Sequence, residues 1–90
     1  MTKQLKPVDL EVTVRSPSQM GSALLRFRKL ALWTQQQAGA RAGIKQAMVS
    51  RVESGAPGTS LETLFRLLAG LDLELVLRKR RQTAHLGTKK

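Results

Sequence analysis

The sequence predicts a mostly α-helical domain that carries a short β-strand at each end. Two patterns indicate this architecture: apolar residues recur every three or four positions between residues 17 and 70, and they alternate with polar residues on either side of that stretch. A chain of 90 residues is long enough for one hydrophobic core and too short for two. We therefore expect one domain of four to five helices, with a small sheet built from the two strands.

The amino-acid composition limits the classes of function that the protein can have. Sixteen lysine and arginine residues against six aspartate and glutamate residues give a formal charge of +10, which favours a polyanionic partner such as nucleic acid or an anionic surface. The chain has no cysteine and one histidine, which excludes disulfides, thiolate metal sites and most catalytic sets. We therefore expect no metal, no cofactor and no enzymatic activity.

The sequence also bears on location. Its first residues carry charges where a secretory signal would be apolar, and nowhere do about 18 apolar residues follow one another. We expect a cytoplasmic protein with no membrane partner.

Residues 1–15 are predicted to form an N-terminal arm and the first strand. Apolar side chains alternate there with polar ones, as on a half-buried strand; they are Val8, Leu10, Val12 and Val14. Ser16 and Pro17 then suit the cap and the first position of a helix. One face of that helix is apolar and consists of Met20, Ala23, Leu24, Phe27, Leu30 and Ala31.

Three further helices are predicted from caps and breakers. Thr34 suits the cap of a helix over about residues 35–42, which Gly43 ends because glycine adopts the left-handed conformation without strain. The next helix covers about residues 45–54, before a loop rich in glycine and proline. Ser60 then suits the cap of a leucine-rich last helix that ends at the next glycine.

The segment QQQAGARAGIKQAMVSRVES, residues 35–54, is typical of a helix-turn-helix. Small residues lie where the two helices must cross, and Gly39 removes a side chain at the tightest point. Three apolar residues are expected to pack on the side of the helix-turn-helix that faces the core: Ile44, Val49 and Val52. The opposite face of the second helix is therefore free to enter the major groove of DNA.

The half of that helix which meets base edges is its N-terminal half. The residues at or near it are Lys45, Gln46, Ala47, Ser50 and Arg51. Gln46 suits base recognition, because a glutamine can bind adenine through two hydrogen bonds. Lys45 and Arg51 share a face with Gln46 in a strongly basic chain, which favours contact with DNA over a merely solvated charge.

Over residues 17–70 the chain resembles the XRE/Cro-type helix-turn-helix regulators, through RFRKLALWTQQQAGARAGIKQAMVSRVESG and SLETLFRLLAGL. Within that family, GIKQAMVSRVESG, the leucine-rich last helix and the following strand are similar to HipB-type antitoxins. The resemblance implies a lambda-repressor-like fold and a sequence-specific DNA-binding repressor of its own operon that binds a HipA-type kinase toxin. The alternative is a free-standing regulator of the same family without a toxin partner.

The same resemblance implies roles for individual residues. Gln46 reads a base, while Thr34 and Gln35 meet the DNA backbone. The residues expected against bases or flanking phosphates are Lys45, Ala47, Ser50 and Arg51. Two positions depart from the family: Leu32 replaces a usual glycine, and Ala38 replaces a larger aliphatic residue. We therefore expect the first loop and the local packing to differ.

Three features have two interpretations. Arg28 and Lys29 either contact phosphate or keep the first helix soluble. Trp33 could stack on a base, but a lone aromatic residue at a helix junction is more typical of a core, and we expect a core position. The basic residues 79–90 are expected to be a disordered tail that either solubilises the chain or contacts DNA or the toxin.

Residues 72–78 are predicted to form the second strand, after a helical DNA-binding domain at residues 16–71. The apolar row assigned to dimerisation is Leu71, Leu73, Leu75 and Leu77. Single strands are unstable, and antiparallel pairing of the two ends would bring opposite charges near each other in a register that the sequence does not determine. The charges are those of Asp9 and Glu11 on the first strand and of Arg78 and Lys79 at the far end of the second. A second copy would complete the sheet, giving a homodimer that reads an inverted repeat with half-sites about 34 Å apart.

Overall fold

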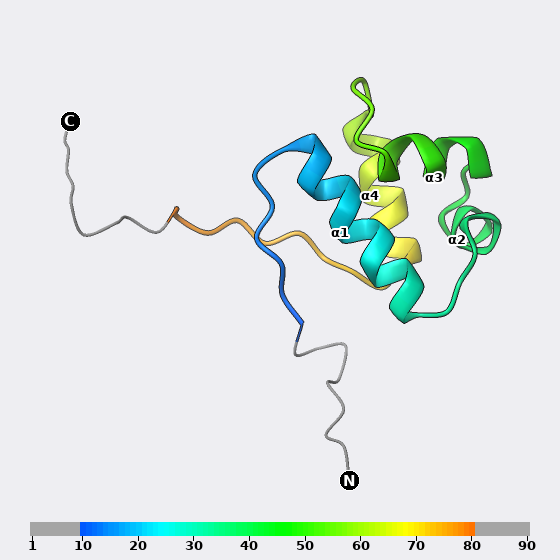
Figure 1. Cartoon of the computed structure of the whole chain (residues 1–90), viewed down its shortest axis with the longest axis horizontal. Helices are drawn as coiled ribbons and strands as arrows, with labels where there is room; N and C mark the ends of the chain where they lie inside the picture. The colour runs from blue at the N-terminus through cyan, green and yellow to red at the C-terminus, as the bar shows by residue number, and fades with distance from the viewer. Residues whose placement is uncertain (1–9, 81–90) are drawn as a thin grey trace, which may run out of the picture.

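Four α-helices make up the regular secondary structure of residues 10–80 (Figure 1). The computed structural model describes residues 10–80, in which α1 (Pro17–Leu30), α2 (Gln35–Ala42), α3 (Gln46–Glu53) and α4 (Leu61–Gly70) follow one another. Helix α2 packs against both α3 and α4, and α1 packs against α3. The predicted mostly helical fold is confirmed. Within residues 10–80, no helix has the length and apolar character needed to cross a membrane.

Hydroxyl caps begin three of these helices where the sequence predicts them. The side-chain oxygens of Ser16, Thr34 and Ser60 accept hydrogen bonds from the backbone N–H three residues later, at 3.1, 3.0 and 3.0 Å. Thr34 forms a full capping box, because its own N–H donates to the Gln37 side chain at 2.8 Å. These bonds satisfy N–H groups that the first turn of a helix leaves without a partner, and so they fix where each helix starts.

A left-handed residue ends α1. Leu32 follows this helix with a φ of 64°. Its N–H donates to the carbonyl of Lys29 at 3.0 Å, and the N–H of Trp33 donates to the carbonyl of Arg28 at 3.2 Å. This is a Schellman motif, in which glycine is usual at the left-handed position. Leu32 therefore has a backbone conformation that favours glycine. This explains why glycine is the usual residue at this position in the family that the sequence resembles.

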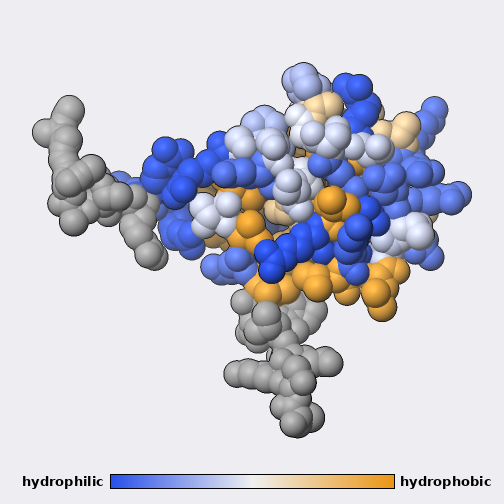
Figure 2. Space-filling model, viewed as in Figure 1, coloured by the Kyte–Doolittle hydropathy of each residue, from blue (hydrophilic) through white to orange (hydrophobic). Residues whose placement is uncertain are grey.

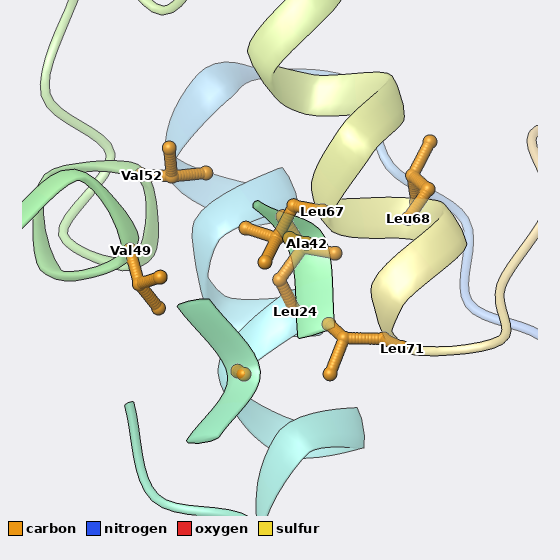
Figure 3. Packing of buried hydrophobic residues seen from close by; sticks show 8 residues of the cluster. Leu24, Ala42, Val49, Val52, Leu67, Leu68 and Leu71 are labelled. Carbon is orange, nitrogen blue, oxygen red and sulfur yellow. The ribbon is translucent and has the colours of Figure 1, made fainter. Parts of the chain in front are cut away.

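The core lies where the four helices meet (Figure 3). Its largest fully buried side chains are Leu24, Val49 and Leu67, and the cluster also contains Ala38, Ala42, Val52, Leu68 and Leu71. Trp33 is half-buried against this cluster, as predicted for a core residue. The guanidinium carbon of Arg41 lies 3.9 Å from the centre of the Trp33 ring, so the outer face of the indole is covered by a cation.

The two predicted strands are not formed within residues 10–80, the part of the chain that is described. No residue from 10 to 80 belongs to a β-strand, and residues 10–15 and 73–80 have no regular secondary structure. Residues 8 and 9 of the first predicted strand lie outside the described part, as does most of the predicted tail at residues 79–90. A strand needs a paired neighbour along its length, and within residues 10–80 neither segment has one.

The predicted dimerisation row is divided between core and surface. Leu71 is buried in the core, which corrects its assignment to a dimer interface. Leu73 packs partly against the same core, and its N–H donates to the carbonyl of Leu68 at 2.7 Å, so it belongs to the end of α4. Leu75 and Leu77 are 44% and 91% exposed. These two leucines are the part of the row that is left for a partner.

The two end segments nevertheless approach each other beside α1 (Figure 1). Arg78 Nη1 lies 3.8 Å from Glu11 Oε1, which is the pairing of opposite charges expected for the two ends. Both side chains are well exposed, so water screens the pair and it contributes little stability. The contact brings the segments together without forming a ladder of backbone hydrogen bonds.

Candidate nucleic-acid interface

Helices α2 and α3 form the predicted helix-turn-helix. Gly43 lies between them with a φ of 73°, and the N–H of Ile44 donates to the carbonyl of Gly39 at 2.9 Å. A Cβ atom on Gly39 would lie 2.7 Å from the carbonyl oxygen of Ile44, closer than any real side chain allows. The prediction that Gly39 permits the tight crossing is therefore confirmed. This turn sets the angle at which α3 projects from α2.

Helix α3 has one buried face and one exposed face. Val49 and Val52 are buried in the core. The residues of the opposite face, all exposed, are Gln46, Ala47, Ser50 and Arg51, and Lys45 is exposed immediately before the helix. Hydrophilic residues cover most of the surface on the side where α2 and α3 lie (Figure 2). The structure thus brings the five residues predicted at the base edges onto one accessible surface.

The two residues predicted at the DNA backbone lie at the start of α2, beside this surface. The Thr34 hydroxyl oxygen is occupied by the helix cap, while the residue itself remains exposed. Gln35 is partly buried and its Nε2 donates to Glu53 Oε1 at 2.9 Å. Gln46 Nε2 in turn lies 3.5 Å from Gln35 Oε1, at the outer limit of a hydrogen bond. Gln35 therefore touches both the scaffold and the exposed face of α3.

The structure corrects the interpretation of Arg28 as a phosphate contact. Only 8% of this residue is exposed, and its guanidinium is bound to Glu53 and to the carbonyl oxygen of Trp33. The hydrogen bond to Glu53 raises the pKa of Arg28 above its ordinary value, and burial opposes this effect without reversing it. Arg28 therefore stays charged inside the domain. Lys29, by contrast, is exposed at the end of α1 and remains available to a phosphate.

Comparison with known proteins identifies the family of this helix-turn-helix. The family model HTH_3, described as helix-turn-helix, matches residues 24–84. Antitoxin HipB of Escherichia coli O6:H1 (strain CFT073) is 38% identical over 64 residues, which cover 71% of this chain and 68% of that protein. Antitoxin HipB of Escherichia coli (strain K12) is 36% identical over 64 residues, covering 71% and 73%. The chain belongs to the HipB family of helix-turn-helix proteins.

A solved structure supports the same relationship at the level of the fold. A chain of the HipA-HipB-O2-O3 complex superposes on this HipB-family domain with a TM-score of 0.73 at 32% sequence identity. The match covers 79% of this chain and 100% of that chain. The four-helix arrangement described above is therefore shared along the full length of the chain in that complex.

Sequence reasoning missed one residue of this HipB-family site. Glu53 lies in the last turn of α3, its side chain is 5% exposed, and it accepts hydrogen bonds from Arg28 on α1 and Gln35 on α2. A signal was present, because Glu53 is a lone acidic residue in a helix expected to face a polyanion. Its charge is acceptable there because it points into the domain and is neutralised by Arg28.

Proposed function

We propose that this chain is a HipB-type antitoxin that represses its own operon by binding operator DNA and that also binds a HipA-type kinase toxin. The proposal of DNA binding rests on the exposed face of α3, which the turn between α2 and α3 holds away from the core. An eight-residue helix with a small polar face, preceded by Lys45 and carrying Arg51 in its last turn, suits the major groove of DNA. The net charge of +10 supplies attraction to the phosphates.

We assign roles to the surface residues on this basis. Gln46 lies at the first position of α3 and reads a base. Lys45, Ala47, Ser50 and Arg51 lie against bases or flanking phosphates. Thr34 and Gln35 meet the DNA backbone at the start of α2, where the helix dipole also favours a phosphate. On α1, Lys29 is a further phosphate contact, whereas the buried Arg28 is not.

The proposed form on DNA is a homodimer on an inverted repeat. Leu75 and Leu77 are exposed on a segment that has no strand partner within residues 10–80, and a second copy offers the same segment in return. Pairing of the two copies would form the small sheet expected from the sequence and cover these leucines. It would also present two α3 helices to successive half-sites about 34 Å apart.

The proposed toxin partner follows from family membership. HipB occurs with HipA in the solved HipA-HipB-O2-O3 complex, whose chain matches four-fifths of this one. The proposed organisation assigns DNA recognition to residues 16–71 and dimerisation to residues 72–78, with the arm at 1–15 and the basic tail at 79–90. A protein that represses its own operon acts where the DNA is, so we place it in the cytoplasm.

Two measurements test this function. The first is a gel-shift titration with the DNA upstream of the chain's own gene against a random duplex of equal length; binding at least about a thousandfold tighter to the upstream DNA is expected for a specific site. The second is co-purification with the product of the neighbouring gene, followed by a growth assay in which this chain relieves the toxicity of that product. Specific DNA binding without a toxin partner would instead identify a free-standing regulator.

A further inference from the structure

Two leucines at the end of α1 are exposed to solvent. Leu30, the last residue of the helix, is 56% exposed, and Leu32, two residues later, is 88% exposed. Neither belongs to the core cluster or to the side chains that pack against it, although the neighbouring Trp33 does. Figure 2 shows hydrophobic surface at the lower edge of the domain, where α1 ends in Figure 1. We call Leu30 and Leu32 the leucine pair.

The backbone of Leu32 is strained. Its φ of 64° lies in the left-handed region, where the Cβ atom crowds the following carbonyl oxygen. Within residues 10–80 the other non-glycine residue with a positive φ is Asp72, a residue type whose short polar side chain tolerates this conformation. Leucine has no such compensation, and glycine would close the same turn without strain. A strained side chain that the core does not use is typical of a contact with another molecule.

Cations border the leucine pair on α1. Arg26 lies four residues before Leu30, on the same side of the helix, and Lys29 lies beside it in the last turn. Both cations are exposed, and neither forms a salt bridge with another residue of the described range 10–80. The complementary surface is an apolar pocket with carboxylates at its edge. This is the chemistry of a protein, because DNA phosphates attract the cations but offer the leucines no apolar pocket.

The leucine pair follows the end of α1 that lies away from the N-terminal arm. Arg78, at the far end of the C-terminal segment, lies beside Glu11 in the arm that leads into the start of α1. Helix α1 has 14 residues, so its two ends are about 20 Å apart. A second copy that pairs with the C-terminal segment near Arg78 is therefore not positioned to cover the leucine pair.

The leucine pair borders the proposed DNA surface without belonging to it. Lys29 precedes Leu32 by three residues and Thr34 follows it by two, and both are proposed to contact the DNA backbone. A molecule that binds the leucine pair lies at the edge of the region covered by DNA and leaves the exposed face of α3 free. It can therefore bind at the same time as operator DNA.

We propose that the leucine pair, bordered by Arg26 and Lys29, is a docking site for the toxin partner, which receives both leucines in an apolar pocket edged by carboxylates. The inference rests on the proposed function, because it takes the product of the neighbouring gene as that partner. It assigns a toxin contact to the helical domain. The side chain of Leu32 is then buried only in the complex, which accounts for a strained leucine that the free domain does not use.

The test measures how tightly the full chain and its variants bind the purified product of the neighbouring gene. Leu32→Gly removes the side chain and the strain, Leu32→Ala removes most of the side chain and keeps the Cβ atom, and Leu30→Gln replaces an apolar side chain by a polar one. Isothermal titration calorimetry measures affinity for the partner. Gel shifts with the upstream DNA and analytical ultracentrifugation measure DNA binding and oligomeric state without the partner.

Each single substitution is expected to lower affinity for the partner by about tenfold or more, as for the anchor residues of an interface. The combination of Leu32→Gly with Leu30→Gln should lower it further. DNA affinity and oligomeric state should stay as in the wild type. Because Leu32→Gly is expected to stabilise the domain, unfolding does not account for its loss of affinity.

Reversal of one charge tests the cationic border. Arg26→Glu should lower affinity for the partner at low salt by about fivefold or more and make that affinity less sensitive to salt. Arg66→Glu, at an exposed position on α4, changes the net charge equally and should leave affinity for the partner unchanged. Effects of net charge alone on DNA binding should be similar in the two variants.

The outcomes separate this inference from the proposed function. If the combined variant binds the partner as tightly as the wild type, the docking site is wrong and toxin binding is preserved. If the wild type does not bind the partner, both the docking site and the toxin part of the proposed function are wrong. Loss of DNA affinity or of dimerisation in the leucine variants would also overturn the inference, as would an effect of Leu32→Gly that Leu32→Ala does not reproduce.

Discussion

Arg28 and Glu53, which are 25 residues apart in the sequence, form a two-point salt bridge that joins the last turn of α1 to the last turn of α3. Their side chains are 9% and 5% exposed. The remaining contact of Arg28, to the carbonyl of Trp33 at 2.8 Å, fixes the loop that leads into α2. The Arg28 side chain thus joins α1, the loop before α2 and α3.

Removing one partner of this pair should destabilise the domain strongly. Arg28→Met leaves the Glu53 carboxylate buried without its counter-charge, and the free energy of unfolding is expected to fall by about 3–5 kcal/mol. Urea denaturation followed by circular dichroism measures the change. The control is Arg66→Ala, which breaks the exposed pair between Arg66 and Glu62 and should cost less than about 1 kcal/mol. Equal effects of the two variants would contradict the assigned role.

Leu32→Gly should stabilise the domain. Leu32 has a φ of 64° and is 88% exposed, so the substitution removes left-handed strain and loses almost no packing. A gain of about 0.5–1 kcal/mol is expected after the greater chain entropy of glycine in the unfolded state is subtracted. The matched control is Leu30→Gly at the end of α1, which has ordinary helical geometry and should lower stability. A loss of stability in Leu32→Gly would show that the leucine makes contacts that outweigh the strain.

Arg51→Ala should change the salt dependence of DNA binding. If its guanidinium contacts a phosphate, the slope of log K against log salt concentration falls by about one unit. Gel-shift titrations at several salt concentrations, on specific and random duplexes, measure this slope. Arg66→Ala on α4 is the control with the same loss of charge and should leave the slope unchanged. An unchanged slope for Arg51→Ala would remove this residue from the phosphate contacts.

Replacing the two exposed leucines of the C-terminal segment should abolish dimerisation without unfolding the helices. Leu75→Asp combined with Leu77→Asp puts charge where we propose that a second copy pairs, and a folded monomer is expected in analytical ultracentrifugation. Leu71→Asp, by contrast, places a charge in the core and should unfold the domain.

The comparison for this pair of substitutions is Leu32→Asp, at an exposed leucine between α1 and α2, which should remain dimeric. A dimer that survives both aspartate substitutions at 75 and 77 would place the interface on the helices instead.

Local signals in the sequence were sufficient to predict the helices. Hydroxyl residues at 16, 34 and 60 and the glycine at 43 act on groups within four residues of themselves, so their effects can be derived from spacing alone. The helix-turn-helix was predicted for the same reason, since Gly39 and Gly43 lie inside one short segment.

Long-range pairing was not predictable in the same way. Arg28 appeared to be a surface cation because its helical position lies off the apolar stripe, and only the folded structure brings Glu53 to it. The alternation of leucines assigns Leu71 and Leu73 to a dimerisation row, whereas in the structure they complete the core and the end of α4. An alternating pattern shows which residues are apolar, but it does not show whether the core of the same chain or a second chain buries them.

The division of α3 into a buried face and an exposed face bears on how operator specificity can change between related proteins. Val49, Val52 and Glu53 hold the helix in place, while the side chains at the exposed positions make few contacts with the rest of the domain. Substitutions on the exposed face therefore cost little stability. A duplicated copy of such a gene can acquire a new operator by changing a few exposed residues, so that two repressors in one cell avoid regulating each other's operons.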